Sequence, residues 1–432
     1  MVYRERKGLT QVMYRRLFSN GAWMLVGTVI YALCQWGQLN LVSRFGTGTD
    51  LGIFTLSIAL ATPVYMFFSF QLRTIQVTDV ESSYGFNSFL VLRCFSGFLA
   101  LTVVLGVVWI IKIEESDALV LVSVCCVKMV EGISEIYNSR LQILGRVEKI
   151  AISFSLKGMA SIAGMYVGLL IFGGLLYGIL ISLMLLMLVV VLYDYLMGRR
   201  VSDTRGAPKP TTLAAIKHIL FKGLPLGLVM LLVALNANVP KYVADYLLGR
   251  ELQGIYSALV YFYVLGNLLI SSVGQVAVPM LAKLYKDKEY LKFKKVSFVF
   301  CLFSPMVGVV AAVVSYFGGP ALLEVALGER FSPYASILFL LLLSSIFLYL
   351  SSSLGFTLTA MREFSVQPKL NLAVLCIAVP VNYYLAKMYG MAGLAYAAMV
   401  VFGLQSLLVL LVIKLRLRAA EASRLLLQCH SG

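Results

Sequence analysis

The stretch LLYGILISLMLLMLVVVLYDYLM, residues 175–197, decides the fold of this chain. It is apolar almost throughout, and about 20 such residues in a helix cross the hydrocarbon core of a bilayer. The whole chain is 60% hydrophobic and only 13% charged, with a mean hydropathy of +0.90. Too little polar surface remains for a water-soluble protein, and the 12% aromatic content argues against a disordered or fibrous one. The composition therefore predicts an integral membrane protein.

Eleven further stretches meet the same criterion, so the sequence predicts an all-α integral membrane protein with twelve transmembrane helices. The predicted spans cover roughly residues 20–43, 50–73, 88–111, 118–140, 150–172, 175–197, 221–247, 254–281, 295–318, 333–358, 368–388 and 391–414.

The basic residues indicate the orientation of these spans, because Lys and Arg concentrate in cytoplasmic loops. With the N-terminus inside, most of the 36 Lys and Arg fall in cytoplasmic segments, and only Lys128 and Lys241 remain within spans. The even span number then places both termini in the cytoplasm. This distribution accounts for the net charge of +16 without a nucleic-acid partner.

The longest cytoplasmic connection divides the chain near its middle. The predicted parts are a cytoplasmic N-terminal segment (1–19), an N-lobe (20–197), a cytoplasmic linker (198–220), a C-lobe (221–414) and a cytoplasmic amphipathic tail (415–432).

The two lobes repeat one another. Residues 51–54, LGIF, recur as QGIY at 253–256, and the same offset pairs Arg93 with Lys295. Each half has six spans, which predicts two parallel six-helix lobes related by an axis along the membrane normal and facing one another across a cleft. The alternative is a chance alignment of apolar segments.

Polar residues in two spans form stripes that match when the halves are aligned with this offset of 202 residues. The stripe on span two covers about 80° of the helix and the one on span eight about 120°. Its members are Thr55, Thr62, Tyr65, Ser69, Arg73 and Gln76 on span two, and Ser257, Tyr261, Asn267, Ser271 and Gln275 on span eight. Tyr65 maps onto Asn267 and Arg73 onto Gln275. We expect both stripes to line the central cavity, although topology alone can explain an arginine at Arg73.

Span four carries a stripe of charges. Lys128, Glu131, Glu135, Asn138 and Gln142 lie within about 80° of one another. A charge at mid-bilayer costs at least about 2.5–3.5 kcal/mol, so we expect the stripe to face a wet cavity. The alternative is a buried structural pair of Lys128 and Glu131 beside a protonated Glu135.

The matching positions of the second half carry no charge. The offset between the halves grows from 202 to about 216 residues in this region. It maps the stripe onto Ser344, Phe347, Ser351, Leu354 and Leu358, so the charge is confined to the first lobe.

Three further charged residues are candidates for an outer gate or cavity wall, namely Arg44, Lys241 and Asp245. Lys241 and Asp245 are four residues apart, and a snorkelling surface pair is the favoured interpretation.

Three short segments suggest a family. Ser19-Asn20-Gly21, Arg44-Phe45-Gly46 and the DLGIF of residues 50–54, set in twelve spans, resemble the polysaccharide flippases of the MOP superfamily, above all the Wzx-type exporters of O-antigen and capsule repeat units. The resemblance implies a V-shaped transporter, not an enzyme, that moves undecaprenyl-pyrophosphate-linked oligosaccharides from the inner to the outer leaflet of the cell membrane. It also implies a cationic cavity, for which this chain offers Arg73, Lys128, Arg44 and Lys241.

The implied partners are the lipid-linked oligosaccharide, membrane lipids, and polysaccharide polymerase and chain-length proteins. No cofactor or metal is expected. Membrane potential alone drives the implied transport, or a proton or sodium ion couples to it at Glu131 or Glu135.

Three alternatives remain open. A multidrug or cation antiporter of the same superfamily and a lipid II-type flippase share the predicted fold. A membrane polymerase or glycosyltransferase is less favoured, because the sequence contains no DxD motif and Asp79 with Glu81 is the only close acidic pair on the inner side.

Overall fold

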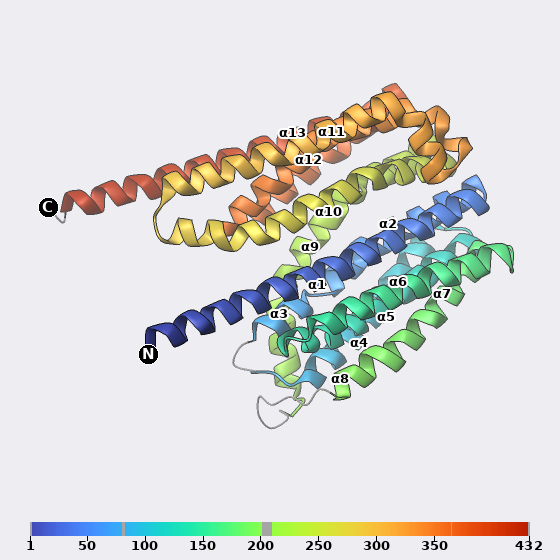
Figure 1. The fold of residues 1–432 in the computed structure, drawn as a ribbon. Coiled ribbons are helices and arrows are strands. Elements are labelled where there is room, and N and C mark those ends of the chain that lie inside the picture. Colours follow the sequence, from blue (N-terminus) through green and yellow to red (C-terminus); the bar gives the residue numbers. More distant parts are fainter. Residues whose placement is uncertain (1, 80–82, 201–209, 364, 431–432) are drawn as a thin grey trace. The chain divides into compact units, whose positions relative to one another are not determined.

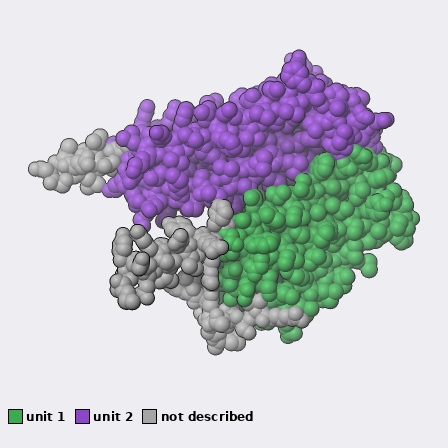
Figure 2. Space-filling model, viewed as in Figure 1, with its two compact units in different colours: residues 1–231 green, residues 232–432 purple. Residues whose placement is uncertain are grey.

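The computed structural model describes residues 2–79, 83–200, 210–363 and 365–430, and within these residues every regular element is a helix. Contacts divide the chain into two compact units, unit 1 (Met1–Leu231) and unit 2 (Leu232–Gly432), which Figure 2 colours separately. Each unit is a bundle of long helices (Figure 1). The protein is therefore an all-α, multi-pass membrane protein.

Unit 1 contains the helices of the first half and the beginning of α9. They are α1 (Val2–Phe45), α2 (Gly48–Phe68), α3 (Leu72–Thr78), α4 (Phe86–Ile111), α5 (Glu115–Ile143), α6 (Val147–Leu170), α7 (Leu175–Val189), the π-helix η1 (Val190–Tyr195), α8 (Leu196–Arg200) and the first part of α9 (Leu213–Leu248).

Unit 2 contains the rest of α9 and four further long helices. They are α10 (Arg250–Lys286), α11 (Tyr290–Leu327), the 3₁₀ helix η2 (Glu329–Tyr334), α12 (Ala335–Ala360) and α13 (Gln367–His430). Gly390 interrupts α13 with φ 59° and ψ −134°, a conformation that glycine adopts without a steric penalty.

In the described part of the chain, ten helices are long and apolar enough to cross a membrane, which is consistent with the twelve predicted spans. The charged helix α5 is not among the ten, and α13 is counted once although its kink separates two apolar segments.

The DLGIF segment at residues 50–54 lies in the first turns of α2, and Thr47 caps that helix. The Thr47 side chain accepts a hydrogen bond from the Asp50 backbone N–H at 3.1 Å, and the Asp50 carboxylate accepts one from the Thr47 N–H at 2.8 Å. This reciprocal capping box satisfies backbone donors that the first turn of a helix leaves without partners.

The division into units differs from the predicted linker. Residues 201–209 of that linker lie outside the described part, and the units divide later, inside α9. The first turns of α9 belong to the core of unit 1, because Ile219 is fully buried against Phe70, Leu92 and Ile136. At the other boundaries, α1 already begins at Val2 and α13 continues through the predicted tail to His430.

Candidate functional site

The charged stripe of α5 lies at the centre of unit 1, and its side chains contact four other helices. Three of its five members reach side chains from α1 to α4, as the following distances show. All three of its ionisable groups are in ion pairs.

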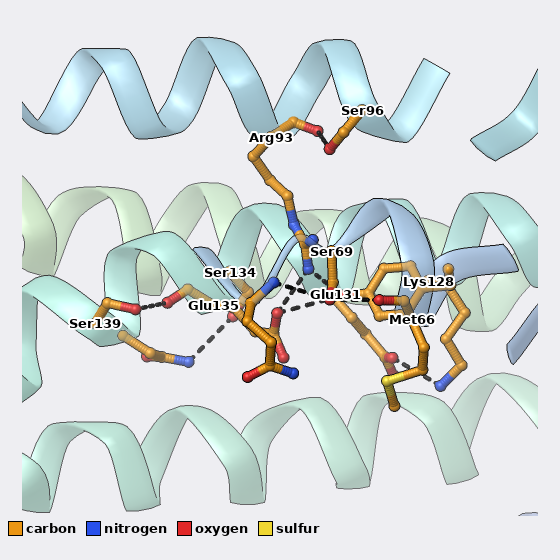
Figure 3. A network of polar contacts seen from close by, with 12 residues as sticks. Met66, Ser69, Arg93, Ser96, Lys128, Glu131, Ser134, Glu135 and Ser139 are labelled. Carbon is orange, nitrogen blue, oxygen red and sulfur yellow. Dashed lines mark hydrogen bonds and ion pairs between the residues drawn. The ribbon is translucent and has the colours of Figure 1, made fainter. Parts of the chain in front are cut away.

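Glu135 forms an ion pair with an arginine of the neighbouring helix α4. The Arg93 Nη2 donates to Glu135 Oε2 at 2.6 Å, and the Tyr65 hydroxyl of α2 contacts both groups. Arg93 is 4% exposed whereas Glu135 is 38% exposed. Figure 3 shows the guanidinium reaching from its helix toward Glu135. The arginine is therefore buried behind its carboxylate.

A glycine makes this pairing possible. A Cβ atom at Gly132 on α5 would collide with the Arg93 guanidinium. The guanidinium therefore crosses α5 at Gly132, the one position of that helix without a side chain. A glycine in the sequence of α5 thus provides the space for Arg93.

Lys128 and Glu131 form a second ion pair at 2.8 Å. The Tyr31 hydroxyl of α1 donates to the other carboxylate oxygen of Glu131. A small cavity of about 40 Å³ adjoins the pair, and both apolar side chains and polar ones such as Gln35 and Gln38 line it. The pair is 24% and 15% exposed, so it is neither sealed nor fully solvated.

Arg73 makes a different kind of contact. Its Nη2 donates to Gln142 Oε1 at 3.0 Å, and no acid pairs with Arg73 among the described residues. The chain reaches this position through a break between α2 and α3, where Phe70 and Gln71 have φ of 46° and 50°. Non-glycine residues rarely adopt this left-handed conformation.

The stripe and its neighbours therefore carry an excess of positive charge. Arg73, Arg93 and Lys128 are opposed only by Glu131 and Glu135, which leaves one cation without a carboxylate. Hydrogen bonds to a charged group are stronger than neutral ones, so an anion can replace Gln142 at Arg73.

A separate polar cluster lies sealed inside unit 1. The Lys157 Nζ donates to Ser134 Oγ at 2.6 Å, and Ser134 donates to Asp194 Oδ2 of η1 at 2.5 Å. Lys157 is 3% exposed and Asp194 0%. Asn138 belongs to this cluster, because it is fully buried and its amide donates to Ser134. The structure thus separates Asn138 from the other members of the stripe.

Ser69, another predicted site residue, ends α2. It is 7% exposed, and its hydroxyl donates to the Met66 carbonyl of its own helix at 2.8 Å.

The predicted residues of unit 2 lie on α10. Asn267 accepts a hydrogen bond from Ser352 of α12 at 2.8 Å, and Ser271 lines a polar pocket of about 280 Å³ between α10, α12 and α13. Gln275 is exposed. No charged side chain lines this pocket.

The outer charges do not pair as predicted. Asp245 forms an ion pair with Arg250 at 2.7 Å instead of with Lys241, because the chain turns after α9 and brings Arg250 back toward the helix end. Lys241 is half-buried and has no ion pair among the described residues. Arg44 is exposed in the last turn of α1.

The sequence analysis missed five residues of these two networks, namely Tyr31, Arg93, Ser134, Lys157 and Asp194. Its count of charges within spans is wrong for Arg93 and Lys157, which are buried in α4 and α6. A single charge in a long apolar window hardly changes the mean hydropathy, so only a residue-by-residue reading of each span could have found them.

No group of three or more His, Cys, Asp or Glu side chains that could hold a metal ion occurs within the described ranges.

Comparison with known proteins agrees with the fold and adds a family. The family model described as "Polysaccharide biosynthesis protein" matches residues 17–285, more than half of the chain. A capsular polysaccharide biosynthesis protein, CapF of Staphylococcus aureus, is 25% identical over 385 residues, which cover 88% of this chain and 94% of that protein.

Solved transporter structures share the fold. An inward-facing MATE-family multidrug resistance transporter of the MOP superfamily superimposes with a TM-score of 0.70 at 14% identity, covering 93% of this chain and 96% of its own. A MOP superfamily transporter from Pyrococcus furiosus gives a TM-score of 0.66 at 15% identity, covering 94% and 96%. At these identities the likeness establishes the fold alone.

Proposed function

Because the chain belongs to the polysaccharide biosynthesis protein family and has the fold of MOP superfamily transporters, we propose that it is a flippase for lipid-linked oligosaccharides. Family and fold are those of membrane transporters rather than enzymes. The proposed cargo is an oligosaccharide repeat unit on undecaprenyl pyrophosphate, moved from the inner to the outer leaflet of the cell membrane by alternating access.

The chemistry of such a cargo explains why it needs a protein. Each sugar hydroxyl that enters hydrocarbon without a partner costs roughly 2–7 kcal/mol, so spontaneous flipping of an oligosaccharide is negligible. The transporter must offer replacement hydrogen bonds at membrane depth. Tyr65 and Gln142 in unit 1 and the serine-lined pocket in unit 2 supply donors and acceptors of this kind.

The excess cation of unit 1 is the observation that carries the proposal. A pyrophosphate needs a positive partner inside the membrane, and Arg73 is a guanidinium bonded only to a neutral amide. Arginine binds phosphate oxygens through two parallel N–H donors, which makes it well suited to this role. We assign Arg73 as the phosphate contact of the flippase, with Gln142 as its resting partner.

Membrane potential supplies a driving force for this export. Moving about two negative charges out of an inside-negative cell gains roughly 4–5 kcal/mol at 100 mV. A proton or sodium ion that neutralised Glu135 or Glu131 would in addition release Arg93 or Lys128 from its ion pair. In the proposed cycle, neutralising one of these carboxylates increases by one the number of unpaired cations that can bind the cargo.

The proposed setting follows from the same assignment. Both termini lie in the cytoplasm, as the distribution of Lys and Arg favours. The product at the outer leaflet is the substrate for polysaccharide polymerase and chain-length proteins, which are the proposed partners.

Complementation of a strain that lacks its own exporter tests the proposal. We expect wild-type protein to restore surface glycan, Arg73→Gln to lower export by about tenfold or more, and Arg73→Lys to retain part of it. Arg146→Gln is the matched control, because Arg146 is 59% exposed and pairs with Glu148 at 3.8 Å. It should export like wild type. Equal protein amounts in the membrane exclude a folding defect.

Two results would contradict the proposal. One is wild-type export by Arg73→Gln. The other is a wild-type protein that restores no glycan but protects cells from cationic drugs, which would favour the antiporter. If the protein rescued cells depleted of their lipid II flippase, the proposed mechanism would stand, but lipid II would replace the oligosaccharide repeat unit as the assigned cargo.

A further inference from the structure

A row of three aromatic rings at one end of unit 1 carries an arginine on each of its outer rings. The ring centroids of Phe86 and Tyr137 are 5.3 Å apart, and those of Tyr137 and Tyr195 are 6.0 Å apart. The Arg140 guanidinium lies 5.1 Å from the centre of the Phe86 ring. The Arg199 guanidinium lies 5.1 Å from the centre of the Tyr195 ring. The row therefore joins the start of α4, the last turn of α5 and α8, which lie at the same end of the unit (Figure 1).

The central ring of the row is tightly packed. Tyr137 is 7% exposed, and a Cβ atom at Gly198 of α8 would lie 2.7 Å from the Tyr137 ring. The glycine thus lets the ring of α5 rest directly on the backbone of α8. Tyr137 also interacts electrostatically with both Arg140 and Arg199. The two arginines therefore belong to one packed site and are not two independent surface charges.

Neither arginine has a negative partner. Within the part of the chain that the structure describes, no acid forms an ion pair with Arg140 or Arg199, and neither side chain donates a hydrogen bond. The Arg140 Nε is buried and has no hydrogen-bond partner. A buried donor without an acceptor is unfavourable, so the site as the protein builds it lacks an acceptor and a negative charge.

The nearby acids are engaged elsewhere. Glu148 pairs with Arg146 at 3.8 Å, and Asp194, the neighbour of Tyr195, accepts a hydrogen bond from Ser134 in the sealed cluster. The site is also distinct from the charged stripe of α5, because Arg140 lies about 160° around the helix from the middle of the stripe at 100° per residue. The proposed transport site therefore does not account for it.

Both arginines lie at the ends of predicted spans. Arg140 is the last residue of the span predicted at 118–140, and Arg199 follows the span predicted at 175–197. The distribution of Lys and Arg favours a cytoplasmic position for both ends. Tyrosine rings concentrate at this depth of a bilayer, where the lipid headgroups lie. The site is thus expected at the level of the inner-leaflet phosphates.

We infer that Arg140 and Arg199 bind the headgroup phosphate of an anionic phospholipid of the inner leaflet. A guanidinium that stacks on a ring keeps its N–H donors in its own plane, where they can reach phosphate oxygens. The lipid supplies the acceptors and the negative charge that the described protein groups do not supply. This lipid is a component of the membrane and not the cargo, so the inference does not rest on the proposed function.

Charge complementarity selects the class of lipid. The headgroup of phosphatidylglycerol has a net negative charge, which suits two cations without an acid. Phosphatidylcholine is zwitterionic, and its ammonium group would meet the same two cations. A free phosphate ion has no acyl chains to hold it at the depth of the site, so it should bind less well than the lipid.

Lipid binding to the purified full-length protein in detergent tests the inference. The probe is phosphatidylglycerol, and native mass spectrometry measures the binding of its first molecule. We expect Arg140→Gln with Arg199→Gln to bind at least about tenfold more weakly, since each cation near an anionic headgroup contributes about fivefold. The matched control is Arg146→Gln, which removes a cation that already has an acid partner and should bind within about twofold of wild type.

A second variant tests the aromatic row while it keeps both charges. Tyr195→Leu removes the ring face under Arg199 and should weaken binding of phosphatidylglycerol by about two- to fivefold. Tyr195→Phe keeps the ring face, so it is the matched control and should bind like wild type.

Thermal unfolding separates the lipid from free phosphate. Phosphatidylglycerol should raise the melting temperature of wild-type protein and not that of the double arginine variant, because a ligand stabilises only the protein that binds it. Phosphatidylcholine and inorganic phosphate should raise neither. Cooperative unfolding of each variant without added lipid shows that it is folded.

Three results would overturn the inference. They are wild-type affinity of the double arginine variant for phosphatidylglycerol, equal binding of phosphatidylcholine and phosphatidylglycerol by wild-type protein, and inorganic phosphate that stabilises wild-type protein as much as the lipid does. If the double variant does not fold, Tyr195→Leu decides the question, and unchanged binding in that variant overturns the inference.

Discussion

Helices α5 and α12 occupy matching positions in the sequence repeat, yet one is charged and the other is not. In unit 1, Tyr65 of α2 contacts Glu135 of α5, and the charge of Arg93 completes the contact. In unit 2, the residue paired with Tyr65 is Asn267 of α10, and it accepts a neutral hydrogen bond from Ser352 of α12. A second neutral bond, from the Tyr349 hydroxyl of α12 to the Tyr263 carbonyl of α10 at 2.9 Å, also joins these helices. The bond between α2 and α5 thus involves a charged carboxylate, whereas the bonds between α10 and α12 are neutral.

The comparison shows that one architecture supports two kinds of interior. Neutral hydrogen bonds between membrane helices are weak, about 0.6 kcal/mol on average, and they suffice to hold α10 and α12 together. Charges are expensive in the membrane, and α12, which matches α5 in the repeat, carries none. We take their presence in one unit only as support for the proposed role in binding an anion.

The largest expected effect comes from the sealed pair of unit 1. Asp194→Asn leaves the buried Lys157 without a charge partner and should cost about 3–5 kcal/mol of stability. Ser353→Ala in α12 is the neutral counterpart, because its buried hydroxyl donates to the Leu350 carbonyl at 2.9 Å and no charged group is involved. We expect a change below about 1 kcal/mol there. Thermal unfolding in detergent measures both.

Replacing the pair together sharpens this result. Lys157→Met with Asp194→Leu should recover much of the lost stability, since both charges are removed at once. Equal melting temperatures for Asp194→Asn and Ser353→Ala would show that the sealed cluster is no more sensitive than a neutral core.

The contact between α2 and α5 should be stronger than its counterpart in unit 2. Tyr65→Phe removes a hydroxyl from Arg93 and Glu135 and should cost about 1.5–3 kcal/mol, because hydrogen bonds to charged groups are the stronger kind. Ser352→Ala removes the bond to Asn267 and should cost about 0.6 kcal/mol. The measurement is again the unfolding midpoint in detergent. A larger loss in Ser352→Ala would reverse the comparison.

Replacing a glycine by alanine should have different effects on α5 and on α12. Gly132→Ala forces the Arg93 guanidinium to move and should cost about 1–3 kcal/mol with a loss of export. Gly355→Ala in α12 meets no atom within 4 Å, so the better helix propensity of alanine should make it neutral or stabilising. Melting temperatures and glycan export of the two variants test this contrast, and identical behaviour would count against a role for the Arg93 crossing.

The smallest expected effect concerns the break in unit 1. Gln71→Gly removes a left-handed conformation that costs roughly 1–2 kcal/mol in a non-glycine residue, but it also loses the bond from Thr74 at 2.8 Å. The net result should be neutral to slightly stabilising. Val273, the corresponding residue, lies inside the continuous helix α10, and Val273→Gly should destabilise. If both variants shifted the melting temperature in the same direction, this prediction would be contradicted.

The membrane fold follows from apolar runs alone, because a bilayer restricts a spanning chain to helices or closed barrels. The stripe on α5 was also visible in the sequence, since residues three, four and seven apart share a helix face. Its partners were not. Whether Asp245 meets Lys241 or Arg250 depends on a turn between helices, and Arg93 reaches Glu135 only because Gly132 leaves room.

Such details depend on packing between helices, which the pattern within one helix does not specify. The break at Phe70 and Gln71 has the same origin. Neither residue type favours a positive φ, so the core around Phe70 imposes it.

Helix α9 begins in the core of unit 1 and ends in unit 2, so the seam of the repeat and the seam of the fold do not coincide. If the chain were divided in the loop before α9, the first fragment would lack Ile219, which packs against Phe70 and Ile136 in the core of unit 1. The second fragment would expose this apolar residue. The core of unit 1 therefore requires residues that the sequence repeat assigns to the second half of the chain.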